Sequence, residues 1–266
     1  MMSLKKISLL VLSLIATSAL VACGEEPSDN DPIPDGGPNG TDPGGSDPGT
    51  AVDSTPIVQK STLVGKAYIL SFDVQYWTKP GGSIGEELGK YTPKFTFQFR
   101  TVDDTLGTFT AVLGTAKNGA QDICNKTYTI TGSFGSSAIG ATTFTTNSLD
   151  VDAIIEGPAV KTLATLRNFT IKGEFFDQGA GYKAGGITAE LDGNQIFSIF
   201  TKMNPVPTSS NELCSNLFDL GVNCEACSFN AGDEHCLTVE ASLFKLNATA
   251  GFVINDVGAT DQTCLN

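Results

Sequence analysis

The stretch FTFQF at residues 95–99 places three phenylalanines at alternating positions, with threonine and glutamine between them. Successive side chains of a β-strand point to opposite faces, so this spacing predicts a strand with one apolar and one polar face. Turn-forming residues separate further segments of the same kind, which predicts an antiparallel β domain of about eight to ten strands. These segments lie at residues 68–76, 109–113, 128–130, 142–146, 149–155, 169–171, 187–191 and 237–243.

The edges of such a sheet must be protected, either by closure into a barrel or by packing as a barrel-like sandwich. The sequence leaves both arrangements open. Trp77, Phe95, Phe97 and Phe99 are expected in the packed core. Their alternative role is to line a ligand cavity, with Trp77 at its mouth.

Two short helices are expected, at residues 83–91 and 211–220. Ser209 or Ser210 can cap the second helix, and Leu213 and Leu217 would share its buried face. The Asp192-Gly193-Asn194 segment has the chemistry of a hairpin turn, with calcium binding by Asp192 and Asn194 as an alternative.

The N-terminus carries Lys5 and Lys6, then an apolar run at residues 7–20 and the sequence Leu20-Val21-Ala22-Cys23. This pattern resembles the signal and lipobox of bacterial lipoproteins. The resemblance implies cleavage before Cys23, a diacylglycerol on its sulfur and a place in the cell envelope. Gly24 stands where an aspartate would retain a lipoprotein in the inner membrane, which favours the outer membrane. A signal peptide cut after Ala22 is the closest alternative, since the apolar run is short for a membrane span.

Residues 24–55 contain repeated Asp-Pro, Gly-Gly and Pro-Gly pairs, eight acidic residues and no basic one. So few apolar side chains predict a disordered tether. The expected organisation is a signal peptide at 1–22, a lipid-anchored tether at 23–55 and one β domain at 56–266. The net charge of −13 disfavours nucleic acid as a partner, because phosphate binding needs lysine and arginine.

Six cysteines remain when Cys23 is set aside, an even number that predicts up to three disulfides in an exported protein. The possible pairings number 15, so connectivity is open, although one bridge should be local to residues 214–236. A Cys124–Cys264 bridge would tie the C-terminus back to an early strand. The other four are Cys214, Cys224, Cys227 and Cys236.

Two other readings of these cysteines compete with disulfides. Cys224 and Cys227 have the spacing of a redox pair, and together with His235 and Cys236 they would supply a zinc ligand set. The turn-rich context argues against the redox pair. The adjacency of His235 and Cys236 argues against one tetrahedral zinc site.

Catalytic and cofactor motifs are missing from the sequence, and His235 is its one histidine, so no cofactor is expected. The first hypothesis is a non-catalytic, membrane-anchored protein that binds or displays a partner. The second is a lipocalin-like carrier of a small apolar ligand. The third is a hydrolase with an unrecognised carboxylate or metal site.

Overall fold

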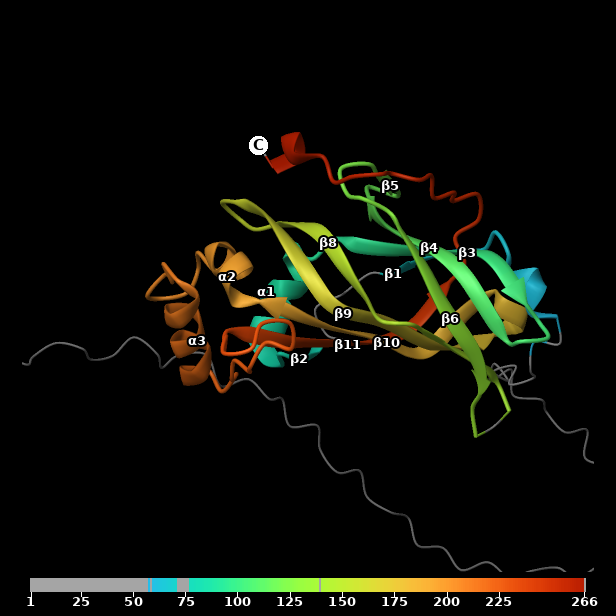
Figure 1. Ribbon diagram of the computed structural model, residues 1–266, viewed down its shortest axis with the longest axis horizontal. Helices are drawn as coiled ribbons and strands as arrows, with labels where there is room; N and C mark the ends of the chain where they lie inside the picture. The colour runs from blue at the N-terminus through green and yellow to red at the C-terminus, as the bar shows by residue number, and fades with distance from the viewer. Residues whose placement is uncertain (1–56, 58, 71–76, 139, 266) are drawn as a thin grey trace, which may run out of the picture. The chain divides into compact units, whose positions relative to one another are not determined.

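In the computed structural model, the strands of the described residues form one antiparallel sheet of eleven strands (Figure 1). The structure describes residues 57, 59–70, 77–138 and 140–265, all within the unit Thr50–Asn266. The predicted mostly β fold is therefore confirmed. The strands are β1 (Ala67–Leu70), β2 (Trp77–Lys79), β3 (Lys94–Asp103), β4 (Thr108–Lys117), β5 (Ala120–Asp122), β6 (Tyr128–Ser136), β7 (Thr142–Thr146), β8 (Leu149–Glu156), β9 (Lys161–Phe176), β10 (Gly181–Asp192) and β11 (Cys236–Asn247).

The alternating segments all fall on strands, although part of the first one, residues 71–76, lies outside the described residues. The strand order is β1-β3-β4-β6-β7-β9-β10-β11-β2, with β5 paired to β4 and β8 paired to β9. The short strands β2 and β5 have no alternating signal, which is why the sequence predicts fewer strands.

The sheet divides along β9, which gives a sandwich-like arrangement instead of a closed barrel. The first part of β9 pairs with β8, and its later part pairs with β7. The outer edge of β8 is covered by side chains, since the Asp152 N–H donates to Tyr128 Oη and the Ile154 N–H donates to Asn125 Oδ1, both at 2.8 Å. Such cover protects an edge from pairing with another chain.

Aromatic rings fill the space between the layers of the sheet. Phe97 is fully buried and stacks on Phe144 of β7, with their ring centroids 5.6 Å apart. The ring centroids of Phe95 and of Phe169 in β9 lie 5.1 Å apart. At Gly132 of β6 an added Cβ would lie 2.3 Å from the Phe109 ring, so only glycine lets this ring pack against the strand.

The helices gather at one end of the sheet (Figure 1). They are α1 (Gly82–Tyr91), α2 (Gly193–Ile196) and α3 (Ser210–Asp219). The predictions of α1 and α3 are confirmed. Ser209 Oγ caps α3 by accepting from the Glu212 N–H at 3.2 Å, and Gly221 follows the helix with a φ of 80°.

The hairpin turn predicted at Asp192-Gly193 is wrong, because these residues begin α2. Asp192 Oδ1 accepts from the Asn194 N–H at 2.8 Å and caps this helix. Aspartate suits both turns and helix N-caps. The next strand, β11, begins only at Cys236, so the chain leaves the sheet after Asp192.

The C-terminal residues 249–265, called the strap below, lie across the outer face of β3 and β4 (Figure 1). Beneath the strap, Thr96 and Gln98 are 0% and 3% exposed. The polar face expected for residues 95–99 is therefore buried, because a segment distant in sequence covers it.

Three disulfides are formed, as the cysteine count predicts. Cys124–Cys264 closes the strap onto the loop after β5, and the two cysteines are 140 positions apart in sequence. Cys214–Cys224 and Cys227–Cys236 are local. The three cysteines of the suggested redox and zinc sites, Cys224, Cys227 and Cys236, are thus oxidised, in pairs that do not join Cys224 to Cys227.

Replacing Phe97 with alanine should lower the free energy of unfolding by about 3–5 kcal/mol, because a fully buried ring would leave a cavity. Urea denaturation measures this change. Leu106→Ala is the control, because Leu106 is 74% exposed and its loss should change stability by less than about 0.5 kcal/mol. Equal effects of the two substitutions would contradict the packing described here.

Candidate functional site

A cleft of about 520 Å³ lies between α1, α3 and the loop at residues 199–205. Its floor is apolar: Ile84, Ile199 and Phe200 are all less than 9% exposed, and half-buried Met203 lines the wall. Asn216 of α3 holds the loop, since its Nδ2 donates to the Pro205 carbonyl at 2.9 Å. An apolar floor of this size suits a small apolar group.

Glu87 of α1 is the best-partnered charge on the cleft wall. Its carboxylate lies 3.2 Å from Lys90 Nζ and 3.3 Å from Lys202 Nζ, and its side chain is 20% exposed. Burial raises the pKa of Glu87, but hydrogen bonds and charge from the two lysines outweigh this effect and hold its pKa below the usual value. Hydrogen bonds to Tyr91 and Glu87 raise the pKa of Lys202. The wall therefore stays charged at neutral pH, above an apolar floor.

Helix α1 packs against the lone tryptophan. Trp77 is 8% exposed, and an added Cβ on Gly85 would lie 2.7 Å from its Cβ, so the helix packs closely on this residue. Trp77 thus contacts the helix that forms one wall of the cleft, but it does not line the cleft itself. Phe95, Phe97 and Phe99 are fully buried among other rings and do not line the cleft.

Sequence reasoning missed the cleft residues Ile199, Phe200 and Met203. They lie in a loop region without clear periodicity, and they reach α1 only through the tertiary fold. The helices were predictable from caps and apolar spacing, but no pattern in the sequence predicts that α1 and α3 lie close together.

A second, smaller pocket of about 280 Å³ lies beside the Cys124–Cys264 disulfide. Lys117 and Lys161 line it, with their Nζ atoms 2.7 and 3.9 Å from Glu156 Oε1. Lys161 also donates to the Cys264 carbonyl at 2.9 Å. Lys117 therefore joins β4 to β8, and Lys161 joins β9 to β8 and to the strap.

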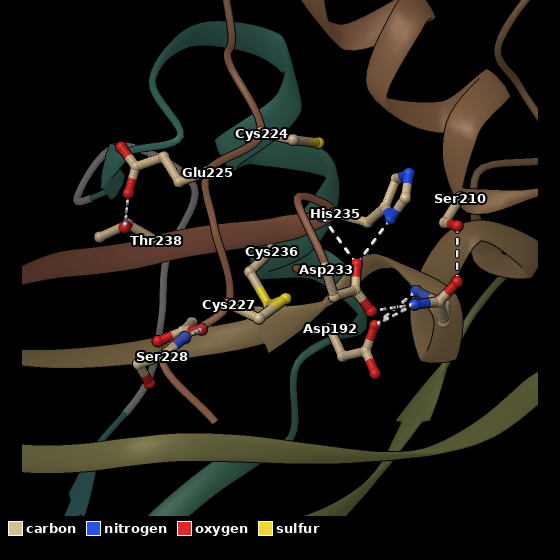
Figure 2. The surroundings of a disulfide bond; sticks show 12 residues. Asp192, Ser210, Cys224, Glu225, Cys227, Ser228, Asp233, His235, Cys236 and Thr238 are labelled. Atoms are coloured by element: carbon tan, nitrogen blue, oxygen red, sulfur yellow. Dashed lines mark hydrogen bonds and ion pairs between the residues drawn. A yellow bond between two sulfur atoms is a disulfide. The ribbon is translucent and has the colours of Figure 1, made fainter. Parts of the chain in front are cut away.

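His235 belongs to a polar network beside the Cys227–Cys236 disulfide (Figure 2). Its Nδ1 lies 2.6 Å from Asp233 Oδ1, and its Nε2 lies 2.5 Å from Asn211 Oδ1. Both ring nitrogens thus face amide or carboxylate oxygens, an arrangement that does not present a serine or cysteine nucleophile to the imidazole.

The same network includes the suggested calcium ligands Asp192 and Asn194. Asn194 Nδ2 donates to Asp192 Oδ1 at 2.9 Å and to Asp233 Oδ2 at 3.0 Å, and Ser210 Oγ donates to Asn194 Oδ1 at 2.5 Å (Figure 2). The amide nitrogen thus occupies the space between the two carboxylates. The network joins the disulfide loop to α2 and α3.

Comparisons of the chain with known protein families, with curated proteins and with solved structures found no match. Among the helices of the described residues, none combines the length and apolar character needed to cross a membrane.

Acidification should remove the contribution of Asp233 to stability. The hydrogen bond from His235 lowers the pKa of Asp233, with desolvation acting in the opposite direction. A lowered folded-state pKa stabilises the protein above the unfolded value of about 3.9, and this contribution is lost as the pH falls through the folded value. Asp233→Asn should therefore be less stable than the wild type at about pH 5, with the difference shrinking toward about pH 2.

Urea midpoints measured across this pH range test the prediction. Glu234→Gln, which removes an exposed carboxylate from the same loop, is the matched control for the loss of one charge. The proposed role of Asp233 would be contradicted if the urea midpoints of the wild type and Asp233→Asn moved further apart on acidification.

Proposed function

We propose that this chain is a lipid-anchored protein of the cell envelope whose β domain binds a small apolar or amphipathic ligand in the cleft between α1 and α3. The cleft carries the proposal, because its apolar floor lies open beside charged groups that are already paired with one another. Opposed lysine and glutamate charges would orient a polar end of the ligand, and the floor would hold its apolar part.

A binding role accounts for the composition of the cleft. Its lining contains neither histidine nor cysteine, whereas it offers apolar contacts and hydrogen-bonding groups such as Ser83 and Asn204. The rings between the sheet layers contact one another, so a ligand held in the cleft lies outside the sheet. This location distinguishes the proposal from a lipocalin-like carrier with its ligand inside a barrel.

The envelope location rests on Leu20-Val21-Ala22-Cys23 and on the residues that precede it. Two acyl chains on Cys23 would anchor the protein firmly. The residue after Cys23 is Gly24, so we propose the outer membrane. An exported chain also fits the three disulfides.

The fluorescent probe 1-anilinonaphthalene-8-sulfonate, which has an apolar body and an anionic end, should bind the folded protein saturably. Met203→Trp should weaken this binding about tenfold or more, because the larger side chain fills the cleft. Fluorescence titration gives both affinities. Leu106→Trp adds the same side chain at an exposed turn away from the cleft lining and should leave the affinity unchanged. Equal binding by Met203→Trp and the wild type would overturn the cleft as the site.

In a bacterial host, the full-length protein should incorporate a fatty-acid probe, and Cys23→Ala should not, because it lacks the sulfur that carries the lipid. Gel fluorescence after labelling measures incorporation. Ala22→Gly keeps a small residue before the cysteine and should still be labelled. Labelling of Cys23→Ala would end the lipoprotein hypothesis and leave the cleft proposal standing.

A further inference from the structure

The strap is held on the sheet mainly through its backbone. Gln121 forms a paired contact with Asn255: its Oε1 accepts from the Asn255 N–H and its Nε2 donates to the Asn255 carbonyl, both at 2.7 Å. Thr127 does the same with Val257, whose N–H donates to Thr127 Oγ1 at 2.8 Å and whose carbonyl accepts from the Thr127 N–H at 3.0 Å. The surface under the strap therefore recognises an extended backbone.

One strap side chain is fully buried in this surface. Ile254 is 0% exposed, and an added Cβ on Gly114 would lie 3.2 Å from its Cγ2, so the absence of a side chain at Gly114 makes room for it. The Gln98 amide bridges the backbone on both sides, accepting from the Ile254 N–H and donating to the Phe252 carbonyl, each at 3.3 Å. The groove thus selects an aliphatic anchor at one position and is tolerant elsewhere.

Two basic side chains also bind the backbone of the strap. Arg100 donates to the Ile254 carbonyl, and Lys161 donates to the Cys264 carbonyl. The strap itself carries Asp256 and Asp261 and no basic residue. An extended segment with a branched aliphatic anchor is therefore the occupant that this groove fits.

We infer that the groove also takes the strap of a second copy of this chain, so that two molecules exchange straps. The groove fits the sequence of the strap, so the same groove contacts would form if the strap came from a second molecule. The short turn at residues 248–251, with Gly251 at a φ of 72°, joins β11 to the strap, and exchange requires this turn to extend. Exchange of an identical element is a low-cost route to a dimer. The inference depends neither on the cleft nor on the lipid anchor.

Exchange changes which chains the disulfide joins. In a closed molecule Cys124 and Cys264 belong to one chain. In an exchanged dimer the Cys124 thiol of one copy and the Cys264 thiol of the other form the bond. Glutathione disulfide is the oxidant: it takes up the two electrons and two protons of these thiols and becomes two glutathione molecules.

An isotope mixture of the wild-type protein tests this directly. Equal amounts of ¹⁴N and ¹⁵N protein are reduced, unfolded and refolded together in a glutathione buffer, at a series of protein concentrations. Mass spectrometry of protease digests then identifies each linked peptide pair. Exchange predicts Cys124–Cys264 pairs with one peptide of each isotope, whose share rises with concentration toward half in a fully exchanged sample.

The local disulfides provide the internal control. Cys214–Cys224 and Cys227–Cys236 should remain single-isotope pairs in the same digests, because both cysteines of each lie in one short segment. Ile254→Asp, which removes the aliphatic anchor, should reduce mixed Cys124–Cys264 pairs to the level of the local disulfides. Single-isotope Cys124–Cys264 pairs at every concentration would show that the groove serves its own strap alone and would overturn the inference. Mixed pairs that persist in Ile254→Asp would also overturn it.

Discussion

The contact of β3 phenylalanines with rings from the opposite layer is the interaction on which the rest of the structure depends. Phe97 stacks on Phe144 of β7, and Phe95 packs on Phe169 of β9, so residues distant in sequence are joined by one apolar layer. Ring packing of this density requires small residues nearby, and Gly132 of β6 supplies the space that the Phe109 ring occupies. The strands on the two sides of the division at β9 therefore form two layers, and the rings pack between these layers.

The alternation at residues 95–99 predicts the strand correctly but not its surroundings. Period-2 spacing identifies the face that phenylalanine occupies, whereas the burial of Thr96 and Gln98 depends on a strap that arrives more than 150 residues later. A glutamine at position 98 suits an exposed or a buried site, since its amide can hydrogen-bond to water or to the strap backbone. Of the strap, Cys264 alone gave a signal, as an isolated cysteine that a bridge to Cys124 would explain.

The helices illustrate the same division between local and tertiary information. Caps and apolar spacing are local properties, which is why α1 and α3 could be predicted nearly to the residue. The turn prediction at Asp192-Gly193 failed because the aspartate side chain caps a helix as readily as it stabilises a turn. The cleft depends on how α1 and α3 approach each other across the loop at 199–205, and no sequence spacing encodes that approach.

The three disulfides connect the parts of the described domain that the ring core reaches least. Cys214–Cys224 holds α3 to the loop that follows it, Cys227–Cys236 holds that loop to β11, and Cys124–Cys264 holds the strap. Segments with few buried apolar contacts open most readily, and covalent closure limits their freedom in the unfolded chain. Helix α3 lines the cleft and the strap covers β3, so each of these features involves one disulfide-bonded segment. The core is filled by its own rings, so the proposed binding site lies at the periphery, where disulfides restrain α3 and the loop that follows it.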